Sequence, residues 1–497
     1  MRRRISSAIL LALGVSACSL APDYRRPAMP VPLALADEPR ETAPVPATTT
    51  DLPSGWQTFI AEPRLRQLAA MAIANNRDLR LALANVDMAR AQYRIRRADL
   101  FPTIAAGGQA NLQRLSADTP AGSIGSNAPG SSAGDGSRRI DTYSAGASLN
   151  AWEIDLFGRL RNENEAALQR YLATDMARSS VQMTLIAELS TLYVRLGADQ
   201  DRLRTTIETQ KAFGVTQAIV LARHDAGAAS ALEVRQAITA YENVRAQVQA
   251  LTTSVAQDRN ALDLIAGAPV PADLLPDGIP TAGITLRTLP GELPSTVLLS
   301  RPDIQQAEHE LQAANADIGA ARAAFFPSLS LVGALGTLST GIGGLFAGGS
   351  NYWAVTPQAS FSIFDAGRAK GGIRYAEAEK RAMLARYERS IQSGFRESAD
   401  ALARRQTLGS EVDARQLQRN AAREAYTLAQ ARFRSGLDPF LVTLDSERAY
   451  YAAELALLAI RETREASSIA LFRALGGWPG ADVAQPPGIV DHGNAGM

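Results

Sequence analysis

The chain repeats itself with a spacing of 209 residues. Three pairs of glycines mark the two copies: Gly158 and Gly367, Gly227 and Gly436, Gly267 and Gly476. Because the offset is the same for all three pairs, the stretch between them has gained and lost no net residues in either copy. A repeat of this length is too long for a solenoid unit. The sequence therefore predicts two halves that share one geometry.

Composition and charge argue against catalysis and against nucleic-acid binding. The formal net charge is +1, so no strong field attracts an anionic polymer. The three histidines, His224, His309 and His492, are too few and too scattered for a metal cluster. The sequence has neither a Gly-x-Ser-x-Gly elbow nor a phosphate-binding loop. We expect no enzyme activity, no metal, no nucleic acid and no cofactor apart from a covalent lipid.

The lipid is expected from the first residues, which have the pattern of a secretory signal. A basic start, Arg2-Arg3-Arg4, precedes an apolar stretch from Ile9 to Val15. Val15-Ser16-Ala17-Cys18 resembles a bacterial lipobox, which predicts removal of residues 1–17 and lipidation of Cys18, the only cysteine. Ser19 stands where an aspartate would favour the inner membrane, so we expect the outer membrane. The alternative is an ordinary signal peptide with a chance cysteine.

Each half begins with a helix that a proline ends. Apolar residues at helical spacing run from about Glu62 to Leu100 and from about Pro302 to Phe325. Pro102 and Pro327 follow, and proline neither continues a helix nor favours helix in the residue before it. We expect a strand to begin at each of these prolines.

After each proline the side-chain period changes from 3.6 to 2, which predicts one β-hairpin per half, at about 102–154 and 327–364. Each strand has an apolar face and a small polar face, and about 10 residues suit a tilted membrane-spanning strand. The apolar positions are Tyr143, Ala145, Ala147, Leu149 and Ala151 in one strand and Trp353, Val355, Ala359, Phe361 and Ile363 in another. Glycine-rich loops at 117–139 and 339–351 connect the strands. Pro357 predicts an irregularity in the last strand.

Two unusually long helices follow the hairpins. They run from Arg159 to Gly227 and from Arg368 to Gly436, a span of 68 residues in both copies. At 1.5 Å per residue each would extend roughly 100 Å, far beyond an ordinary globular helix. The two glycines predict a left-handed helix end and a turn, after which a shorter helix returns.

These elements divide the chain into six parts. They are a signal peptide (1–17), an extended lipid-anchored segment (18–61), a first repeat (62–267), a proline-rich linker (268–293), a second repeat (294–476) and a flexible C-terminal tail (477–497). Within the repeats, the long helices with their returns occupy 159–267 and 368–476.

Four membrane strands cannot stand alone in lipid. Open sheet edges leave backbone groups unpaired there, and about eight strands form the smallest barrel. Two chains would give eight strands, whose interior side chains fill, whereas three chains give about twelve and an aqueous lumen. The pattern therefore favours a trimer with the long helices hanging from its barrel as a tunnel.

Several motifs in order along residues 18–478 carry a family resemblance. They are Trp56-Gln57-Thr58-Phe59, Asn75-Asn76 with Asp78-Leu79-Arg80, Arg301-Pro302-Asp303-Ile304, Ala320 to Pro327, and Arg434-Ser435-Gly436-Leu437-Asp438. The sequence resembles the TolC-type outer-membrane efflux family, and most closely its lipidated OprM/NodT branch. The resemblance implies an internally duplicated fold of α-helices plus a membrane β-barrel. A trimer forms the twelve-stranded outer-membrane barrel, with four strands per chain, continuous with a long periplasmic α-helical barrel.

The resemblance also implies a function and partners. The homotrimer would lie in the outer-membrane lipid of a Gram-negative bacterium and extend into the periplasm. It would work with a periplasmic adaptor (membrane fusion) protein and an inner-membrane pump, usually of the resistance-nodulation-division (RND) type. The protein would be the passive exit duct of this tripartite multidrug efflux system for small toxic molecules and drugs.

In this family the duct is constricted at the periplasmic tip, beside the helix break of the second half. Counted from Gly436, the implied gate residues are Leu441, Asp445 and Arg448, with Leu441 as an apolar ring. Asp445 and Arg448 are spaced to share a helix face and form a pair. The first half has uncharged residues at the equivalent positions: Leu232, Gln236 and Thr239. The competing interpretation is a solvated pair of little energy.

Two other functions remain open. The same architecture suits an export duct for proteins or oligosaccharides. From a different class, the chain could be a non-conducting structural lipoprotein of the envelope, although a tether has no need of lipid-facing strands.

Overall fold

The computed structural model describes residues 19–35, 55–115, 132–134, 137–280, 283–284 and 293–477. Cys18, the signal peptide, most of the first hairpin loop and the tail after Gly477 lie outside these ranges, so their predictions stay predictions. Among the described residues, no helix has both the length and the apolar character needed to cross a membrane.

The described chain forms two units. One consists of the residues up to Arg26, Asp87–Leu172 and Glu308–Ala385, and it contains the β-sheet. The other consists of Pro27–Val86, Ala173–Ala307 and the residues from Arg386 on, and it is helical. Each unit therefore takes segments from both copies of the sequence repeat.

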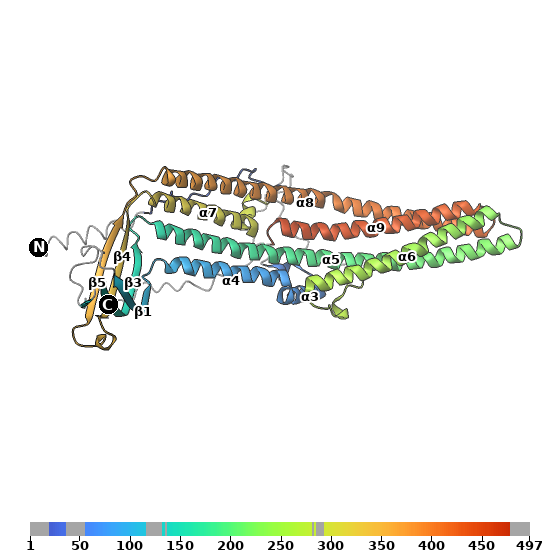
Figure 1. The fold of residues 1–497 in the computed structure, drawn as a ribbon. Coiled ribbons are helices and arrows are strands. Elements are labelled where there is room, and N and C mark those ends of the chain that lie inside the picture. The colour runs from blue at the N-terminus through green and yellow to red at the C-terminus, as the bar shows by residue number, and fades with distance from the viewer. Residues whose placement is uncertain are drawn as a thin grey trace. The chain divides into compact units, whose positions relative to one another are not determined.

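The long helices agree with the sequence prediction. They are labelled in Figure 1: α5 (Arg159–Asp225), α8 (Arg368–Arg434), α6 (Ala231–Ala266) and α9 (Phe440–Ala474). Helices α5 and α8 have 67 residues each. The starts of α5 and α8, and those of α6 and α9, differ by the same 209 residues as the glycines.

The turns that follow α5 and α8 have the same hydrogen bonds. Gly227 and Gly436 have φ values of 74° and 75°, a left-handed conformation that glycine adopts without strain. In each turn the glycine amide donates to the carbonyl three residues back, and the next amide donates to the carbonyl five residues back, at 2.7–3.0 Å. This is the helix ending that the glycines predict.

The returning helices begin differently. Ser230 caps α6: its hydroxyl accepts from the Glu233 amide at 3.2 Å, and the Glu233 carboxylate accepts from the Ser230 amide at 2.6 Å. Helix α9 begins after Pro439, whose side chain accepts no capping bond. One copy thus satisfies the first amides of its returning helix with a capping box, and the other does not.

The prediction of a single helix from Glu62 to Leu100 is wrong. This stretch forms two helices, α3 (Pro63–Asn75) and α4 (Arg77–Ala98), which are separated at Asn76. The Asn76 amide oxygen accepts from the Leu79 backbone at 2.9 Å, and its amide nitrogen donates to the Ile265 carbonyl at 2.9 Å. An asparagine side chain that bonds the backbone in this way competes with helix continuation.

Shorter elements complete the helical parts. They are α2 (Trp56–Phe59), α7 (Pro302–Ala323) and the 3₁₀ turns η1 (Ala272–Leu274), η2 (Ser295–Ser300) and η3 (Ile342–Gly344). The end of α7 lies within a few residues of its predicted end.

The strands form one antiparallel sheet in the order β1-β3-β4-β5, with the short β2 paired to β3 (Figure 1). They are β1 (Ile104–Leu115), β2 (Ser132–Gly134), β3 (Ser137–Ile154), β4 (Ser328–Ser339) and β5 (Asn351–Ser360). The two predicted hairpins are therefore confirmed as β1–β3 and β4–β5, and the β3–β4 pairing joins them into one sheet.

The strand ends differ from three expectations. The expected loop at 117–139 includes β2 and the start of β3, because backbone pairing extends past the tyrosine where the alternation begins. Strand β5 ends at Ser360, so Phe361 and Ile363 follow it. No irregularity occurs at Pro357, which is in register with Leu331; proline is tolerated because β5 is the last strand of this sheet.

The irregularity lies instead in β3. Leu149 is opposite Gly333 and Trp152 is opposite Leu331, so β3 has one more residue than β4 between these pairs. Ala151 there has a φ of 34°. Such a bulge shifts the alternation by one position. Trp152 therefore takes the face that the simple alternation assigned to Ala151.

Glycines allow close approach in the middle of the sheet. Gly107 is opposite Gly146, and Gly146 is opposite Gly336. A Cβ atom on Gly146 would overlap the Leu335 carbonyl, whereas one on Gly107 would meet nothing within 4 Å. Glycine at such a pair permits strong local curvature of a sheet.

Candidate membrane-facing sheet and gate

The register sorts the side chains of the sheet into two faces. The mainly apolar face includes Ile104, Ala106, Ala110, Leu112, Tyr143, Ala145, Ala147, Leu149, Trp152, Ile154, Leu329, Leu331, Leu335, Trp353, Val355 and Ala359. The same face also carries Gly108, Arg114, Asp141, Gly333, Thr337, Ser339, Asn351 and Pro357, the polar ones toward the loop ends of the strands. The other face consists mainly of small or polar residues: Ala105, Gly107, Gln109, Asn111, Ser144, Gly146, Ser148, Glu153, Ser330, Ala334, Gly336, Ala354, Thr356 and Gln358, with Val332, Leu338 and Tyr352 as larger exceptions. The predicted division into an apolar and a small polar face is therefore confirmed.

The apolar face is open to solvent in the single chain. Ile104, Leu335 and Trp353 are 74, 63 and 78% exposed. No charged residue occurs from Ala323 to Phe364, a stretch that includes the whole of the β4–β5 hairpin. An apolar outer face opposite a polar inner face is the pattern of a membrane barrel wall.

The prolines proposed as strand entries stand just before the strands. Pro102 is two residues before β1, and Pro327 is one residue before β4. The Phe326 ring stacks on Phe157, with centroids 4.5 Å apart, so the chain is packed where β4 begins.

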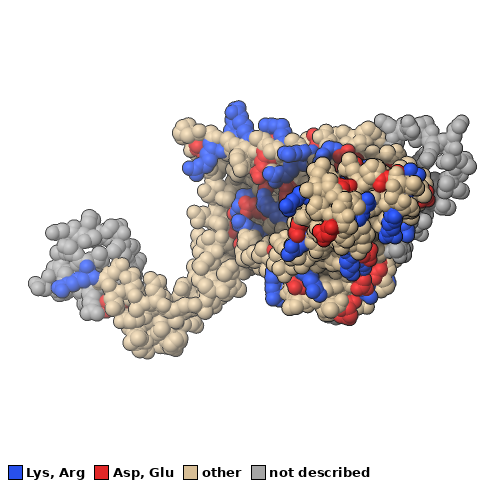
Figure 2. All heavy atoms as spheres, turned by 90° about the vertical axis from the view of Figure 1, so that its right-hand side faces the viewer, with Lys and Arg blue, Asp and Glu red and all other residues tan. Residues whose placement is uncertain are grey.

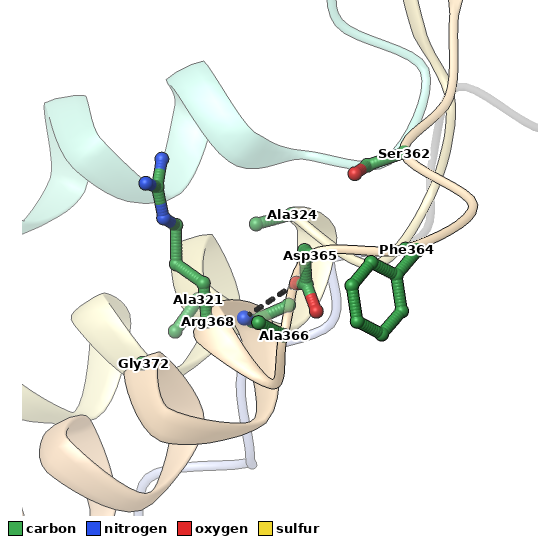
Figure 3. A pocket seen from close by; sticks show the side chains of 9 residues that line it. Ala321, Ala324, Ser362, Phe364, Asp365, Ala366, Arg368 and Gly372 are labelled. Atoms are coloured by element: carbon green, nitrogen blue, oxygen red, sulfur yellow. Dashed lines mark hydrogen bonds between the residues drawn. The ribbon is translucent and has the colours of Figure 1, made fainter.

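An open pocket of about 680 Å³ lies where α7 ends and α8 begins (Figure 3). Its wall includes Ala321 of α7, Ala324 just after α7, and Phe364 and Asp365 before α8. Both Asp365 oxygens are engaged: Oδ1 accepts from the Gly367 amide and Oδ2 from the Ala369 amide, each at 2.8 Å. These bonds hold the pKa of Asp365 below its usual range. The carboxylate thus caps α8, which accounts for its position in the pocket.

The first described residues lie along α7. Ser19 donates to Asn162 at 2.9 Å, Arg322 donates to the Leu20 carbonyl at 3.2 Å, Asn315 donates to the Pro22 carbonyl at 2.7 Å, and Arg26 pairs with Glu308 at 2.7 Å. We call residues 19–26 the N-terminal strap. It runs antiparallel to α7, so Ser19 lies toward the end of α7 that leads into β4.

An apolar cluster joins the four helices near the two glycine turns. This turn cluster consists of Phe213 and Val220 of α5, Val234, Ala237, Ala240 and Val244 of α6, Phe433 of α8, and Phe440 and Leu444 of α9. All of its members are at most 9% exposed. The helix beginnings and ends at the turns are therefore fixed by packing as well as by backbone hydrogen bonds.

The predicted gate residues lie on the exposed side of α9. Leu441 is 49% exposed, and the Asp445 and Arg448 side chains are 66 and 50% exposed. Their closest charged atoms are 4.0 Å apart, the outer limit of an ion pair. Within one chain such an exposed pair contributes about 0–1 kcal/mol. The structure brings the three residues onto one helix face, and their role as a gate stays a prediction.

Charges of both signs surround the turns. On the face that Figure 2 turns toward the viewer, basic and acidic side chains are interspersed. Near Gly436, Arg432 holds Asp438 with bonds of 2.6 and 2.9 Å. This ion pair links the last turn of α8 to Asp438, the last residue of the Arg434–Asp438 turn motif.

Sequence reasoning missed a buried acid in α9. Glu447 is 2% exposed and lies between Thr216 of α5 and Tyr426 of α8. Its burial raises its pKa to about 7. The sequence did indicate that Glu447 would be buried, because it lies three residues after Leu444 and seven after Phe440, on the same face of the helix.

A buried arginine was also missed as a structural centre. Arg301, in the Arg301-Pro302-Asp303-Ile304 motif, is 4% exposed. It bonds Asp303 at 2.8 Å, Glu397 of α8 at 2.9 Å and the Ala474 carbonyl of α9 at 2.7 Å. One guanidinium thus links the start of α7 to α8 and to the end of α9.

The chain has clear relatives. The model of the family described as outer membrane efflux protein matches residues 68–268 and 293–477. The toluene efflux pump outer membrane protein TtgC and the antibiotic efflux pump outer membrane protein ArpC, both of Pseudomonas putida, are each 40% identical over 480 residues, 96% of either chain. The open state of the MtrE outer membrane channel of Neisseria gonorrhoeae superposes with a TM-score of 0.81 at 34% identity, covering 92% of this chain and 98% of that one. The chain therefore belongs to the outer membrane efflux protein family and has the TolC-type fold of its outer-membrane channels.

Proposed function

We propose that three copies of this chain close one barrel in the outer membrane and act as the passive exit duct of a tripartite pump, without enzyme activity. The observation that carries the proposal is a sheet of four long strands with an apolar face, a small polar face and two free edges, β1 and β5. Free edges are not stable in lipid, so the sheet must close with other copies. Three copies supply about twelve strands and a lumen wide enough for water.

The cargo is a range of small toxic molecules, including apolar ones. The names of TtgC and ArpC, which refer to toluene and to antibiotics, support this class. A duct wall of mainly small side chains has no evident selective site, so selection belongs to an inner-membrane pump of the RND type. A periplasmic adaptor protein connects the pump to the exposed helix turns.

The outer-membrane position is reinforced by a lipid on Cys18. The N-terminal strap supports this proposal, because its first residue, Ser19, is held beside the end of α7 that enters the sheet. Acyl chains on the preceding residue would then reach the membrane that the barrel crosses. Radioactive palmitate should label the wild-type chain and not Cys18→Ser. Equal labelling of both would remove the anchor and leave the barrel unaffected.

The gate consists of Leu441, Asp445 and Arg448. Asp445 and Arg448 are only loosely paired within one chain, which leaves both free to contact a neighbouring copy in the closed trimer. Adaptor binding would exchange these contacts for others and shift the population toward the open state.

Single-channel conductance in planar bilayers tests the duct and the gate together. Purified wild-type trimers should open rarely, and trimers carrying both Asp445→Ala and Arg448→Ala should open more often and for longer. An exposed pair elsewhere in the helical unit, Arg245 with Glu242, provides the matched control, and its double alanine variant should behave like wild type. Conductance that the gate variant leaves unchanged would keep the duct and remove this gate. Folded wild-type and gate-variant trimers that never conduct would favour a structural lipoprotein.

A further inference from the structure

Glu447 is an acid buried where several helices meet. The Tyr426 hydroxyl donates to Oε1 at 3.3 Å, and the Thr216 hydroxyl donates to Oε2 at 3.5 Å. Both hydrogen bonds are long, and among the described residues no cation pairs with this carboxyl group. Such a site favours the neutral form of an acid, because burial penalises the charge and nothing compensates it.

The groups that contact Glu447 supply no balancing charge. Arg434, the last residue of α8, acts on the pKa of Tyr426 but not on that of Glu447. On α5, Thr216 is flanked by the apolar Phe213 and Val220 of the turn cluster. On α8, Tyr426 is itself held by Gln430 at 3.0 Å. Burial raises the pKa of Glu447 to about 7 against the lowering effect of its two hydroxyl partners, and no charged residue is among the causes.

Other titratable groups of α9 and α6 face elsewhere. Asp445 and Arg448 lie on the exposed side of α9 and pair with each other. Tyr450 stacks on Tyr426 with centroids 6.0 Å apart, and Tyr451 donates to Gln247 of α6 at 2.6 Å. Among the described residues, the titratable group bonded to Glu447 is Tyr426, which stays neutral because burial raises its pKa.

The sequence repeat shows that the fold does not require an acid here. The residue 209 positions before Glu447 is Ile238, which packs against the turn cluster. An apolar side chain therefore suits the equivalent place beside an equivalent glycine turn. Replacing a buried ionisable group by an apolar one is often neutral or stabilising. A duct that keeps an acid at this position gains a property that packing alone does not provide.

We propose that Glu447 is a proton-controlled latch, which holds the start of α9 against α5 and α8 when it is neutral and releases it when it ionises. This inference rests on the proposed gate, because Leu441, Asp445 and Arg448 occupy the exposed side of the same turns of α9. The first turn of α9 has no side-chain cap, so it is held by the packing of Phe440 and Leu444 in the turn cluster, next to Glu447.

The direction of the pH effect follows from linkage. Below the ordinary value of 4.5 the acid is neutral whether α9 is packed or released, so packing is complete. As pH rises from there through about 7, the released state loses its proton first and is favoured more strongly. The duct should therefore be more closed at pH 5 and more open at pH 8.

The first test is the opening probability at pH 5 and pH 8. It should rise by more than about tenfold in wild type, within the limit set by the separation of the two pKa values. Glu447→Gln, which resembles the neutral acid, should stay near the wild-type value at pH 5 and change by less than about twofold. The matched control is Glu465→Gln, a buried acid of α9 that Arg464 and the Ile284 amide hold at 3.1 Å, and it should follow wild type. A Glu447→Gln duct that follows the wild-type pH curve would overturn the latch.

A second measurement separates the latch from the duct. A nitroxide on Val442→Cys, which is 43% exposed in the native chain, reports the mobility of the start of α9 in a Cys18→Ser background. The label should become more mobile between pH 5 and pH 8, and Glu447→Gln should abolish this change. Mobility that is independent of pH, or that changes equally in both proteins, contradicts the latch whatever the conductance. A label that responds in trimers that never conduct, including the Asp445→Ala/Arg448→Ala trimers, keeps the latch and removes the proposed function.

Discussion

Asp199 and Leu408 occupy the same position of the repeat, 209 residues apart. Both are buried, but Asp199 lies among charged side chains and Leu408 among apolar ones. Asp199 accepts from Arg202 at 2.6 Å in a cluster of charged side chains between α5, α6 and α9. Leu408 packs in an apolar cluster with Leu457 and Ile460. At this position α9 therefore contacts α8, which belongs to its own copy, through apolar side chains. It contacts α5, which belongs to the first copy, through the ion pair of Glu462 with Arg202.

The charged cluster should make stability depend on pH. Asp258 of α6, paired with Arg195 at 3.0 Å, has its pKa raised to about 6, chiefly by burial. For an acid whose pKa is raised by folding, the stabilisation is full below its ordinary value of 3.8 and is lost as pH rises through about 6. The thermal midpoint of Asp258→Asn should therefore fall less than that of wild type between pH 4 and pH 7. An equal fall in the two proteins would show that Asp258 does not titrate in this range.

Removing the buried guanidinium of Arg301 should be among the most destabilising changes outside the sheet. Arg301→Met leaves Asp303 and Glu397 without their cation, and breaking a buried pair in this way costs about 3–5 kcal/mol. The control is Arg64→Met, because Arg64 forms a more exposed pair with Asp277 at 2.9 Å, and its removal should change the thermal midpoint little. Thermal midpoints of the detergent-solubilised proteins measure both. Similar midpoints for the two variants would mean that Arg301 does not hold the three helices together.

The glycine pair in the sheet should decide whether the barrel assembles. Gly146→Ala places a methyl group against the Leu335 carbonyl, so β3 and β4 must separate. Gly107→Ala, in the adjacent strand and on the same face, meets nothing and should be tolerated. The amount of heat-modifiable trimer in outer membranes, measured on gels, should fall severalfold for Gly146→Ala only. Normal assembly of Gly146→Ala would contradict the close approach of these strands.

Asn76 should stabilise the start of α4. Asn76→Ala removes the cap of this helix and the bond to the Ile265 carbonyl, at a cost of about 0.5–2 kcal/mol. Asn75→Ala is the matched neighbour, because the Asn75 side chain donates to the Met71 carbonyl of its own helix, at 3.0 Å, and to no other element among the described residues. Hydrogen exchange of the amides after residue 76 should accelerate in the first variant and not in the second. Unchanged exchange in Asn76→Ala would mean that the two helices are separated by packing alone.

Much of the fold was predictable because its signals are local and repeated. The glycines fix the helix ends through a backbone conformation that few other residues adopt, and the prolines mark the helix stops in both copies. Alternation identified both hairpins, since a sheet with one apolar face requires it. The family's motifs then supplied what a single chain cannot show, the trimer and its partners, which stay proposals here.

The errors arose where one residue changed the geometry through a distant contact. Asn76 interrupts a continuous helical pattern by bonding the Ile265 carbonyl, 189 residues away in sequence. The bulge at Ala151 shifts the face of Trp152, and alternation alone cannot locate such a shift. Glu447 was missed because a glutamate in a helix is usually exposed, and only the packing of α5 and α8 shows otherwise.

The two glycine turns have a consequence for how such a duct evolves. Their hydrogen bonds are the same in both copies, yet one returning helix carries a capping box and the other carries a proline and, two turns later, a buried acid. The two copies of a duplicated sequence can differ in this way while they keep the same turn. The copy with the capping box keeps a well-capped helix start, so the other copy can carry an uncapped start and a buried acid in the same assembly.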